Sequence, residues 1–267
     1  MGKGHDGGHQ GRRWLIIMYY YIVASGSKGN ATIVVDKDIV ILIDMGIAFS
    51  RFEEELNKIN ISPKQISAAL FTHNHTDHIS GLKFIPIKKQ YALEGTLPSS
   101  GHNVLNLFES VTIGHLQVTP IKASHDATNP CGYMIKNETE TLVYITDTGI
   151  FPEENFKYIA NPDYLIIESN HDISMLMKTN RPMQLKQRIL SEHGHLNNED
   201  SAVAALEIIG NKTKDIILAH LSEEANTPSK ALEAYENVFK YFARDIRKYK
   251  LRCANQWTPL LGGKYEN

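Results

Sequence analysis

Residues 73–78 constrain this 267-residue chain more than any other segment, because they hold three histidines and an aspartate. The segment directly follows a short apolar run, which predicts a buried strand. Alternate residues of an extended chain point the same way, so His73 and His75 can aim at one point. Asp77 and His78 then open a helix and can face a second point nearby. Since imidazoles and carboxylates are common zinc ligands, the segment predicts two metal ions held side by side.

A surface loop with this composition by chance is the alternative, because short motifs produce false matches. The pattern His-x-His-x-Asp-His nevertheless resembles the signature of the metallo-β-lactamase fold superfamily. The other motifs of that superfamily appear in order: Asp44, His125, Asp147 and His220 each follow an apolar run that predicts a strand. Each would be ordinary alone, since Asp147 also fits common turn chemistry. Their order and strand context together favour the resemblance.

The resemblance implies an α/β fold, the αββα sandwich of the metallo-β-lactamase fold. It also implies a site for two divalent metal ions. The first ion takes His73, His75, His125 and Asp147, and the second takes Asp77, His78, Asp147 and His220. Asp44 supports the metal loop by hydrogen bonding. Histidine-rich ligation favours zinc, while the two aspartates leave manganese open.

Three further stretches narrow the resemblance: residues 24–30, 168–172 and 194–200 look like those of the bacterial WalJ exonucleases. They also resemble the phage cyclic-nucleotide phosphodiesterases that defeat Pycsar immunity, with transfer-RNA 3′-processing enzymes more distantly similar. The resemblance covers about residues 19–225. The stretch between the second and third motifs looks shorter than in WalJ, which puts the substrate groove of the longer enzymes in doubt.

Phosphodiester hydrolysis needs a proton for the leaving oxygen, and His195 is the candidate acid. By the resemblance, Glu168 orients this histidine and favours its charged form. Asp77 is assigned to the catalytic set as well as to the metals. The alternative for His195 is a loop residue before the helix start at 197–199. His171 is expected either to support the fold or to hydrogen-bond a metal ligand.

Residues 25–30, Ser-Gly-Ser-Lys-Gly-Asn, have two interpretations. The glycines suit a loop that cradles a phosphate, but no Gly-Lys-Ser/Thr follows, as a nucleoside-triphosphate loop requires. A tight turn between two strands is favoured. We expect this turn to lie near the metals, with Ser27 or Asn30 ordering neighbouring ligands or loops.

The charge balance bears on the substrate. The chain has 28 basic and 30 acidic residues and a pI near 6.6, whereas proteins that grip long nucleic acids usually carry a basic surplus. One local basic cluster fits a phosphate or a solvated helix face equally well: Lys178, Arg181, Lys186 and Arg188. The sequence therefore predicts a metal-dependent phosphodiesterase for a small nucleotide, with a cyclic mononucleotide, opened to its monophosphate, as the leading substrate.

Three other functions stay open. A WalJ-like DNA exonuclease would show a continuous basic groove that leads to the metals. A non-catalytic, metal-stabilised nucleotide-binding regulator would be expected to have lost a ligand, whereas every ligand position here is filled. A β-lactamase is disfavoured, because the stretches at 168–172 and 194–195 belong to the phosphodiesterase branch of the resemblance.

Composition predicts a cytoplasmic enzyme with no membrane segment. The mean hydropathy is −0.29, and no apolar run approaches the roughly 18 residues of a membrane span. The sequence contains two cysteines, Cys131 and Cys253, and such low usage fits a reducing compartment. A homodimer is also predicted, through the apolar side chains of residues 80–110. The alternative for that region is burial in the chain's own core.

The predicted organisation is a disordered tail or extension at residues 1–17, followed by one catalytic domain at 18–267. Apolar runs predict strands near residues 19–23, 31–36, 39–43, 67–71, 116–121, 131–136, 141–146, 164–168 and 215–219. Helical periodicity predicts helices at 50–59, 198–209 and 229–249. The last of these carries an apolar stripe that is expected to pack against a sheet.

Overall fold

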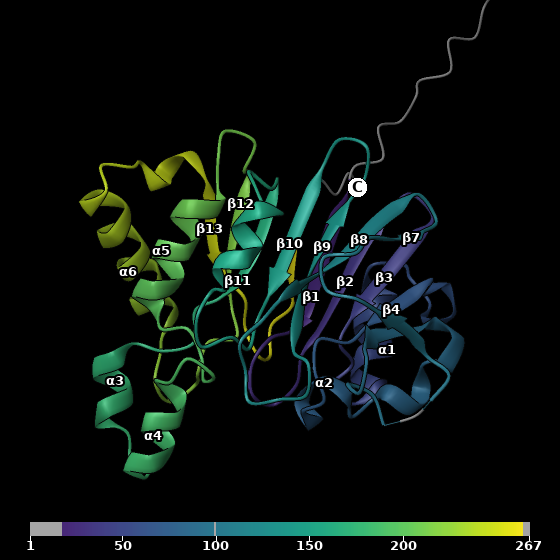
Figure 1. The fold of residues 1–267 in the computed structure, drawn as a ribbon, viewed down its shortest axis with the longest axis horizontal. Coiled ribbons are helices and arrows are strands. Elements are labelled where there is room, and N and C mark those ends of the chain that lie inside the picture. The colour runs from purple at the N-terminus through teal and green to yellow at the C-terminus, as the bar shows by residue number, and fades with distance from the viewer. Residues whose placement is uncertain (1–17, 99, 264–267) are drawn as a thin grey trace, which may run out of the picture.

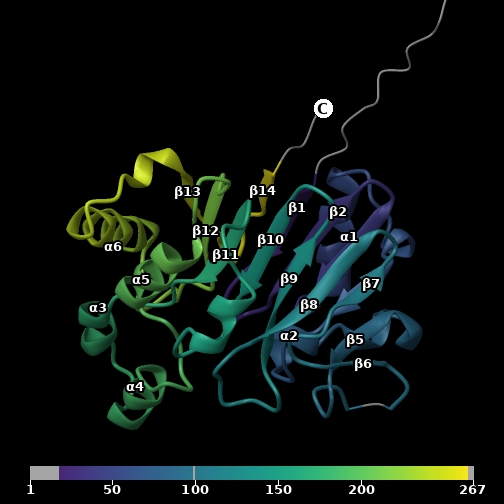
Figure 2. The same ribbon diagram turned by 45° about the horizontal axis from the view of Figure 1, so that its top comes forward.

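The computed structural model describes residues 18–98 and 100–263. Within them, two seven-stranded β-sheets pack face to face, and helices cover their outer faces (Figures 1 and 2). This is the αββα sandwich that the sequence predicts. The predicted tail at residues 1–17 lies outside the described residues.

The first sheet contains the amino-terminal strands and, at one edge, the last strand of the described chain. Its order is β14-β1-β2-β3-β4-β5-β6. The pairs from β14 to β3 are antiparallel, and those from β3 to β6 are parallel. The strands are β1 (Tyr19–Ala24), β2 (Ala31–Asp36), β3 (Ile39–Ile43), β4 (Ala68–Leu70), β5 (Gln90–Leu93), β6 (Asn103–Leu105) and β14 (Leu260–Gly263).

The second sheet has the order β13-β12-β11-β10-β9-β8-β7. The pairs from β7 to β10 are antiparallel, whereas β10, β11, β12 and β13 run parallel to one another. The strands are β7 (Val111–Ile113), β8 (Leu116–Lys122), β9 (Cys131–Lys136), β10 (Thr141–Ile145), β11 (Tyr164–Glu168), β12 (Asp215–Ala219) and β13 (Lys250–Cys253).

Helices cover both outer faces and line one end of the sandwich. Helix α1 covers the first sheet, α5 and α6 cover the second, and α3 and α4 project beside the end where α2 lies (Figure 1). The α-helices are α1 (Phe49–Lys58), α2 (Thr76–Ile79), α3 (Ile173–Lys178), α4 (Met183–Ile189), α5 (Asn198–Ile208) and α6 (Pro228–Tyr241). Single 3₁₀ turns occupy Pro63–Gln65, Leu82–Phe84, Ile87–Lys89, Glu153–Lys157 and Ile246–Lys248.

Successive residues of the central strands serve different cores. In β3, Ile41 packs between the two sheets, whereas Leu42 packs in the cluster that contains α1. In β10, Tyr144 packs between the sheets and Val143 packs in the cluster that contains α5 and α6. Because both faces of these strands are covered, their sequences are apolar throughout rather than alternating. This explains why they could be predicted as short apolar runs.

Helix α6 shows where the predicted pattern was too long. The helix ends at Tyr241, and the predicted continuation to residue 249 is wrong. Ala243 adopts a left-handed conformation, with φ of 53°, and Arg244 N donates to Phe239 O at 2.8 Å. This is the bonding of a Schellman cap, which terminates a helix without a glycine here. The apolar positions beyond it belong to a 3₁₀ turn and to the approach to β13, a strand that the pattern did not predict.

The apolar region at residues 80–110 is divided between core and surface. Leu93 and Leu105 are buried between the sheets, and Ile85 is buried in the cluster under α1. Phe84 is 46% exposed and stacks on Phe49 with ring centroids 4.6 Å apart. Much of this region therefore serves the chain's own core, and the homodimer stays a prediction. No helix in the described ranges is both long and apolar enough to span a bilayer.

The cap of α6 gives a test of the fold. A side chain at a left-handed position costs about 1 kcal/mol relative to glycine, so Ala243→Gly should raise the free energy of unfolding by about that amount. The matched control is Ala234→Gly in the middle of α6, where the same change should lower it by about 1 kcal/mol or more. Urea unfolding measures both. A loss of stability in Ala243→Gly would contradict the described cap.

Candidate dinuclear metal centre

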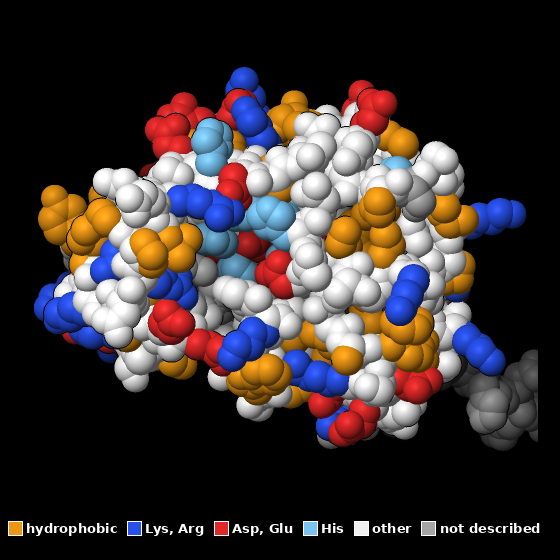
Figure 3. Space-filling view, turned by 90° about the horizontal axis from the view of Figure 1, so that it is seen from below, with side chains coloured by type: hydrophobic (Ala, Val, Ile, Leu, Met, Phe, Trp, Pro, Cys, Tyr) orange, Lys and Arg blue, Asp and Glu red, His pale blue; other side chains and the backbone are white. Residues whose placement is uncertain are grey.

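The candidate ligands follow strands of both sheets and meet in a hollow at one end of the sandwich, where histidine and acidic side chains are visible together (Figure 3). Three of the residues have unusual backbones: φ is 58° at Asp44, 55° at Asp147 and 55° at His220. Left-handed conformations are uncommon outside glycine, although Asp and His tolerate them better than most residues. Each bends the chain sharply after β3, β10 or β12, and such strain clusters at functional sites.

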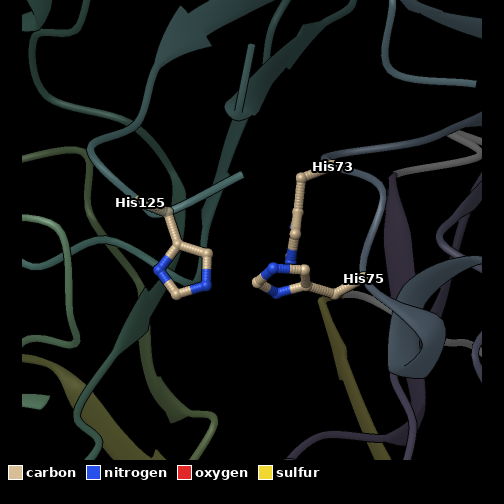
Figure 4. Close-up of side chains that lie close together, drawn as sticks. All are labelled: His73, His75 and His125. Atoms are coloured by element: carbon tan, nitrogen blue, oxygen red, sulfur yellow. The ribbon is translucent and has the colours of Figure 1, made fainter. Parts of the chain in front are cut away.

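Three imidazoles form the first group. His73 and His75 come from the loop after β4, and His125 follows β8 of the other sheet; their rings point toward one another (Figure 4). Each offers a ligand atom within 4.8 Å of the others. Ring centroids are 4.6 Å apart for His73 and His75, 5.2 Å for His73 and His125, and 5.0 Å for His75 and His125. This spacing suits one cation between the three rings.

A second group combines Asp77, His78 and His220, again with ligand atoms within 4.8 Å. Asp147 lies between the groups. Its Oδ2 is 3.2 Å from His78 Nε2, and its Oδ1 is 3.5 Å from His220 Nε2 and 4.0 Å from His125 Nε2. The structure thus brings together all seven predicted ligands, with Asp147 in the position of a bridge.

Buried atoms without partners test whether a metal fits. Within the described residues, His73 Nε2 and His220 Nε2 are buried and accept or donate no hydrogen bond. Leaving such atoms unpaired is costly, and native proteins rarely do it. A cation between these nitrogens and the Asp147 carboxylate would satisfy them. The donor set of imidazole nitrogens and carboxylate oxygens fits divalent metals, zinc among them.

Hydrogen bonds to the other ring nitrogens aim the histidines at the centre. His78 Nδ1 is 2.8 Å from Asp44 Oδ2, and His125 Nδ1 donates to Gly194 O at 2.9 Å. Partners of this kind fix the tautomer and direct Nε2 toward the centre. Asp44 also accepts from Thr72 N at 2.8 Å, so it supports the metal loop as the resemblance implied. The carbonyl of Gly194 and the side chain of Thr72, whose Oγ1 donates to Asp44 Oδ2 at 2.9 Å, were missed, because nothing in the sequence marks them.

The electrostatics divide the histidines into two kinds. Burial lowers the pKa of His73 well below its ordinary value, and burial also lowers the pKa of His125. Burial acts against protonation of His78 as well, but the carboxylates of Asp44 and Asp147 outweigh it and raise the pKa of His78 well above its ordinary value. A metal must displace a proton there, so binding should weaken as the pH falls.

Glu168, at the end of β11, connects the metal ligands to the predicted acid. Its Oε1 lies 2.8 Å from His195 Nδ1 and 3.0 Å from His220 Nδ1. Its Oε2 accepts from Thr148 N at 2.7 Å. The carboxylate is fully buried, whereas the His195 side chain is 22% exposed. One buried carboxylate therefore orients both a candidate ligand and the imidazole that reaches the hollow.

The turn at residues 25–30 contacts three of the candidate ligands. Asn30 N donates to Asp77 O at 2.8 Å, and Asn30 Nδ2 is 3.0 Å from His78 Nε2. Ser25 Oγ accepts from His220 N at 2.8 Å. Of the two residues predicted to order neighbouring ligands, Asn30 does so, whereas Ser27 is exposed and Ser25 makes the second contact.

His171 does not make the hydrogen bond that one interpretation required. Its side chain is fully buried, and within the described residues neither ring nitrogen has a hydrogen-bond partner. Its backbone oxygen accepts from Asn198 N at 3.0 Å, so this residue supports the start of α5. Burial lowers the pKa of the His171 imidazole to about 4, which keeps the ring neutral.

The predicted basic cluster is mostly occupied by structural contacts. Lys186 is buried, and its Nζ donates to the carbonyls of Met177 and Thr179. Arg181 pairs with Glu224, and Arg188 pairs with Asp126 at the edge of the hollow. These contacts favour the helix-face interpretation over a ready phosphate site.

Comparison with known proteins agrees with this geometry. The beta-lactamase superfamily domain matches residues 40–221, which is most of the chain. The chain belongs to this superfamily. It is 35% identical over 222 residues to exodeoxyribonuclease WalJ of Streptococcus pneumoniae, covering 78% of this chain and 82% of the relative. Exodeoxyribonuclease YycJ of Bacillus anthracis is 33% identical over 222 residues, covering 78% and 84%.

A solved structure of the metallo-β-lactamase fold protein YhfI from Bacillus subtilis superposes with a TM-score of 0.68. It shares 17% identity and covers 92% of this chain and all of that one. This likeness supports the fold alone. The identities to WalJ and YycJ confirm the WalJ side of the resemblance, whereas the likeness to the phage phosphodiesterases stays a prediction.

Removal of the Asp44 charge tests the metal centre. Asp44→Asn replaces the acceptor of His78 Nδ1, and loss of such a partner typically lowers metal affinity 10–100-fold. Competition with a chelator measures the affinity for zinc. The control is Asp36→Asn, another buried aspartate, which contacts His115 and Asn137 instead. Equal affinities in the Asp44 and Asp36 variants would contradict the assignment.

His171 gives a pH prediction. The unfolded chain protonates this residue below its ordinary pKa of 6.5, but the folded chain does so only near pH 4. Between these values the unfolded state binds more protons than the folded state. His171 therefore leaves the free energy of unfolding unchanged above pH 6.5 and lowers it as the pH falls toward 4. His171→Leu should reduce the acid-induced loss by at most about 3 kcal/mol and keep stability at pH 7.5, because no hydrogen bond is removed. Urea unfolding in the presence of a chelator, at pH 7.5 and near pH 4, measures both proteins. An equal loss of stability between these pH values in the wild type and in His171→Leu would contradict the prediction.

Proposed function

We propose that the chain is a metal-dependent phosphodiesterase that cleaves nucleotide phosphodiester bonds. The observation that carries the proposal is the bifurcated contact of Glu168 Oε1 with His195 and His220. It joins the candidate ligand His220 to an imidazole that is 22% exposed. A phosphodiester has a poor alkoxide leaving group that needs a proton, and this imidazole is placed to supply it.

In this proposal the two metals, when bound, supply an activated water and neutralise charge on the phosphate oxygens. His195 holds the proton for the leaving oxygen at Nε2, since Glu168 occupies its Nδ1. Burial would raise the pKa of Glu168, but the charge and hydrogen bond of His195 outweigh it and lower that pKa below its ordinary value. Glu168 therefore stays ionised and keeps the imidazole oriented.

Two substrate classes have support. The relatives that are named exodeoxyribonucleases favour a DNA strand. The surface favours a smaller nucleotide such as a cyclic mononucleotide, because basic and acidic side chains alternate around the hollow and form no continuous basic path on this face (Figure 3). Incubation of the metal-loaded protein with end-labelled single-stranded DNA and with 3′,5′-cyclic mononucleotides separates the classes. No product from either would refute the proposed function.

The acid role of His195 can be tested directly. His195→Ala should lower kcat about 10²–10⁴-fold on a substrate with an alkoxide leaving group while both metals stay bound. A p-nitrophenyl phosphodiester has a leaving group that needs no proton, so its hydrolysis should be largely preserved. The control is His115→Ala, which removes a histidine that contacts Asp36 instead. Equal loss on both substrates in His195→Ala would show that the residue acts on structure rather than as the acid.

A further inference from the structure

A second cavity adjoins the metal hollow. The opening beside the metal ligands has a volume of about 430 Å³ and is lined by His75 and His125, among others. A larger cavity of about 810 Å³ lies next to it, between the end of β8 and the turn after β10. His193 lines both. The two cavities therefore adjoin at His193, on the side of the metal hollow that His75 and His125 line.

His193 is held in place but keeps one nitrogen free. Its Nδ1 lies 3.0 Å from Ser124 Oγ, and its backbone oxygen accepts from Asp126 N at 3.1 Å. The side chain is exposed. In the described part of the chain, Nε2 has no hydrogen-bond partner. An exposed imidazole with a fixed backbone and a free nitrogen suits a contact with a bound molecule at the junction.

The larger cavity has the wrong charge for a run of phosphates. Lys122 and Lys157 line it, but so do three carboxylates, of Glu153, Glu154 and Glu192. Lys122 is already paired with Glu154 at 2.6 Å. A chain of phosphodiesters passing through would meet more negative than positive charge, which costs affinity.

The same cavity has the chemistry of a nucleoside site. Ile150, Phe151 and Pro152 supply an apolar wall, and Ile150 is 42% exposed. Carboxylates accept hydrogen bonds from sugar hydroxyls and base amino groups. An apolar wall with a few polar groups is usual for ligand pockets, whose volumes run from about 300 to 1,000 Å³.

We propose that this cavity binds the uncharged nucleoside attached to the cleaved phosphate, and that His193 Nε2 contacts an oxygen of that nucleoside at the junction. The inference rests on the proposed phosphodiesterase function and adds where the nucleoside lies. It limits the substrate on this side to a terminal nucleoside, because a further phosphate would face the three glutamates.

The cavity beside Trp257 is the alternative place for a nucleoside. Trp257 is 57% exposed and lines a separate cavity of about 320 Å³ beside the turn at residues 25–30. Its Nε1 donates to Glu223 at 2.7 Å, and Lys28 and Arg51 lie over its ring. None of the candidate metal ligands lines this cavity. Its groups already have protein partners, so we assign the nucleoside to the cavity beyond His193.

The test measures how much a nucleoside adds to binding. The metal-loaded protein hydrolyses methyl p-nitrophenyl phosphate, and the inhibition constants of methyl phosphate and of thymidine 3′- and 5′-monophosphate are determined against it. The better nucleotide should bind at least about tenfold more tightly than methyl phosphate. His193→Ala should reduce this advantage about three- to tenfold, the worth of one hydrogen bond. Ile150→Asp, which adds a fourth carboxylate at an exposed position, should reduce it as well.

Trp257→Ala is the matched control and should keep the wild-type advantage. Equal binding of nucleotide and methyl phosphate by the wild type would overturn the inference. So would an unchanged advantage in both cavity variants, or a loss confined to Trp257→Ala. If the ester is not hydrolysed, the inhibition constants are determined with whichever of DNA or cyclic mononucleotide gives product, and no product from any of the three would defeat the proposed function and the inference with it.

Discussion

The site depends on three adjacent parallel strands of the second sheet, whose carboxyl ends lie side by side at the same end of the sandwich. β10, β11 and β12 pair in register, with Ile145 opposite Ile167 and Glu168 opposite Ala219. Asp147, Glu168 and His220 therefore emerge side by side from the ends of neighbouring strands. Crevices at the carboxyl ends of parallel strands are common binding places, because side chains converge there on a rigid scaffold. Here the convergence lets one buried carboxylate, Glu168, hold a candidate ligand and the candidate acid at once.

Within the first sheet, the loops around the candidate ligands approach one another very closely. The first sheet supplies His73, His75, Asp77 and His78, and the loop after β3 must pass directly against them. A β-carbon at Gly46 would lie 1.5 Å from Asp77 O, so only glycine allows this contact. Gly46 N in turn donates to Asn30 O, and Asn30 N donates to Asp77 O. The resulting chain of backbone hydrogen bonds makes the metal loop part of the rigid core, which favours a preorganised site.

The sequence predicted features that depend on which residue types occur, such as the candidate ligands. It did not predict features that depend on backbone conformation. The seven candidate ligands stood out because histidines and aspartates follow several apolar runs in the order of the superfamily's motifs, and the structure places these residues together. The left-handed backbones of Asp147 and His220, the carbonyl of Gly194 that orients His125, and the position of Ser25 carry no such mark. Likewise, the cap at Ala243 uses a residue with high helix propensity, so periodicity alone extended α6 too far. The return of β14 to pair with β1 is a long-range contact that no local pattern encodes.

The central claim is that two metal ions bind side by side, bridged by Asp147. Anomalous diffraction from a metal-loaded crystal, collected at the zinc and manganese absorption edges, measures this directly. The account predicts two peaks about 3.5–4 Å apart, one beside His73, His75 and His125, the other beside Asp77, His78 and His220, with the carboxylate of Asp147 between them. A single peak, or peaks away from these residues in a protein that hydrolyses phosphodiesters, would contradict it.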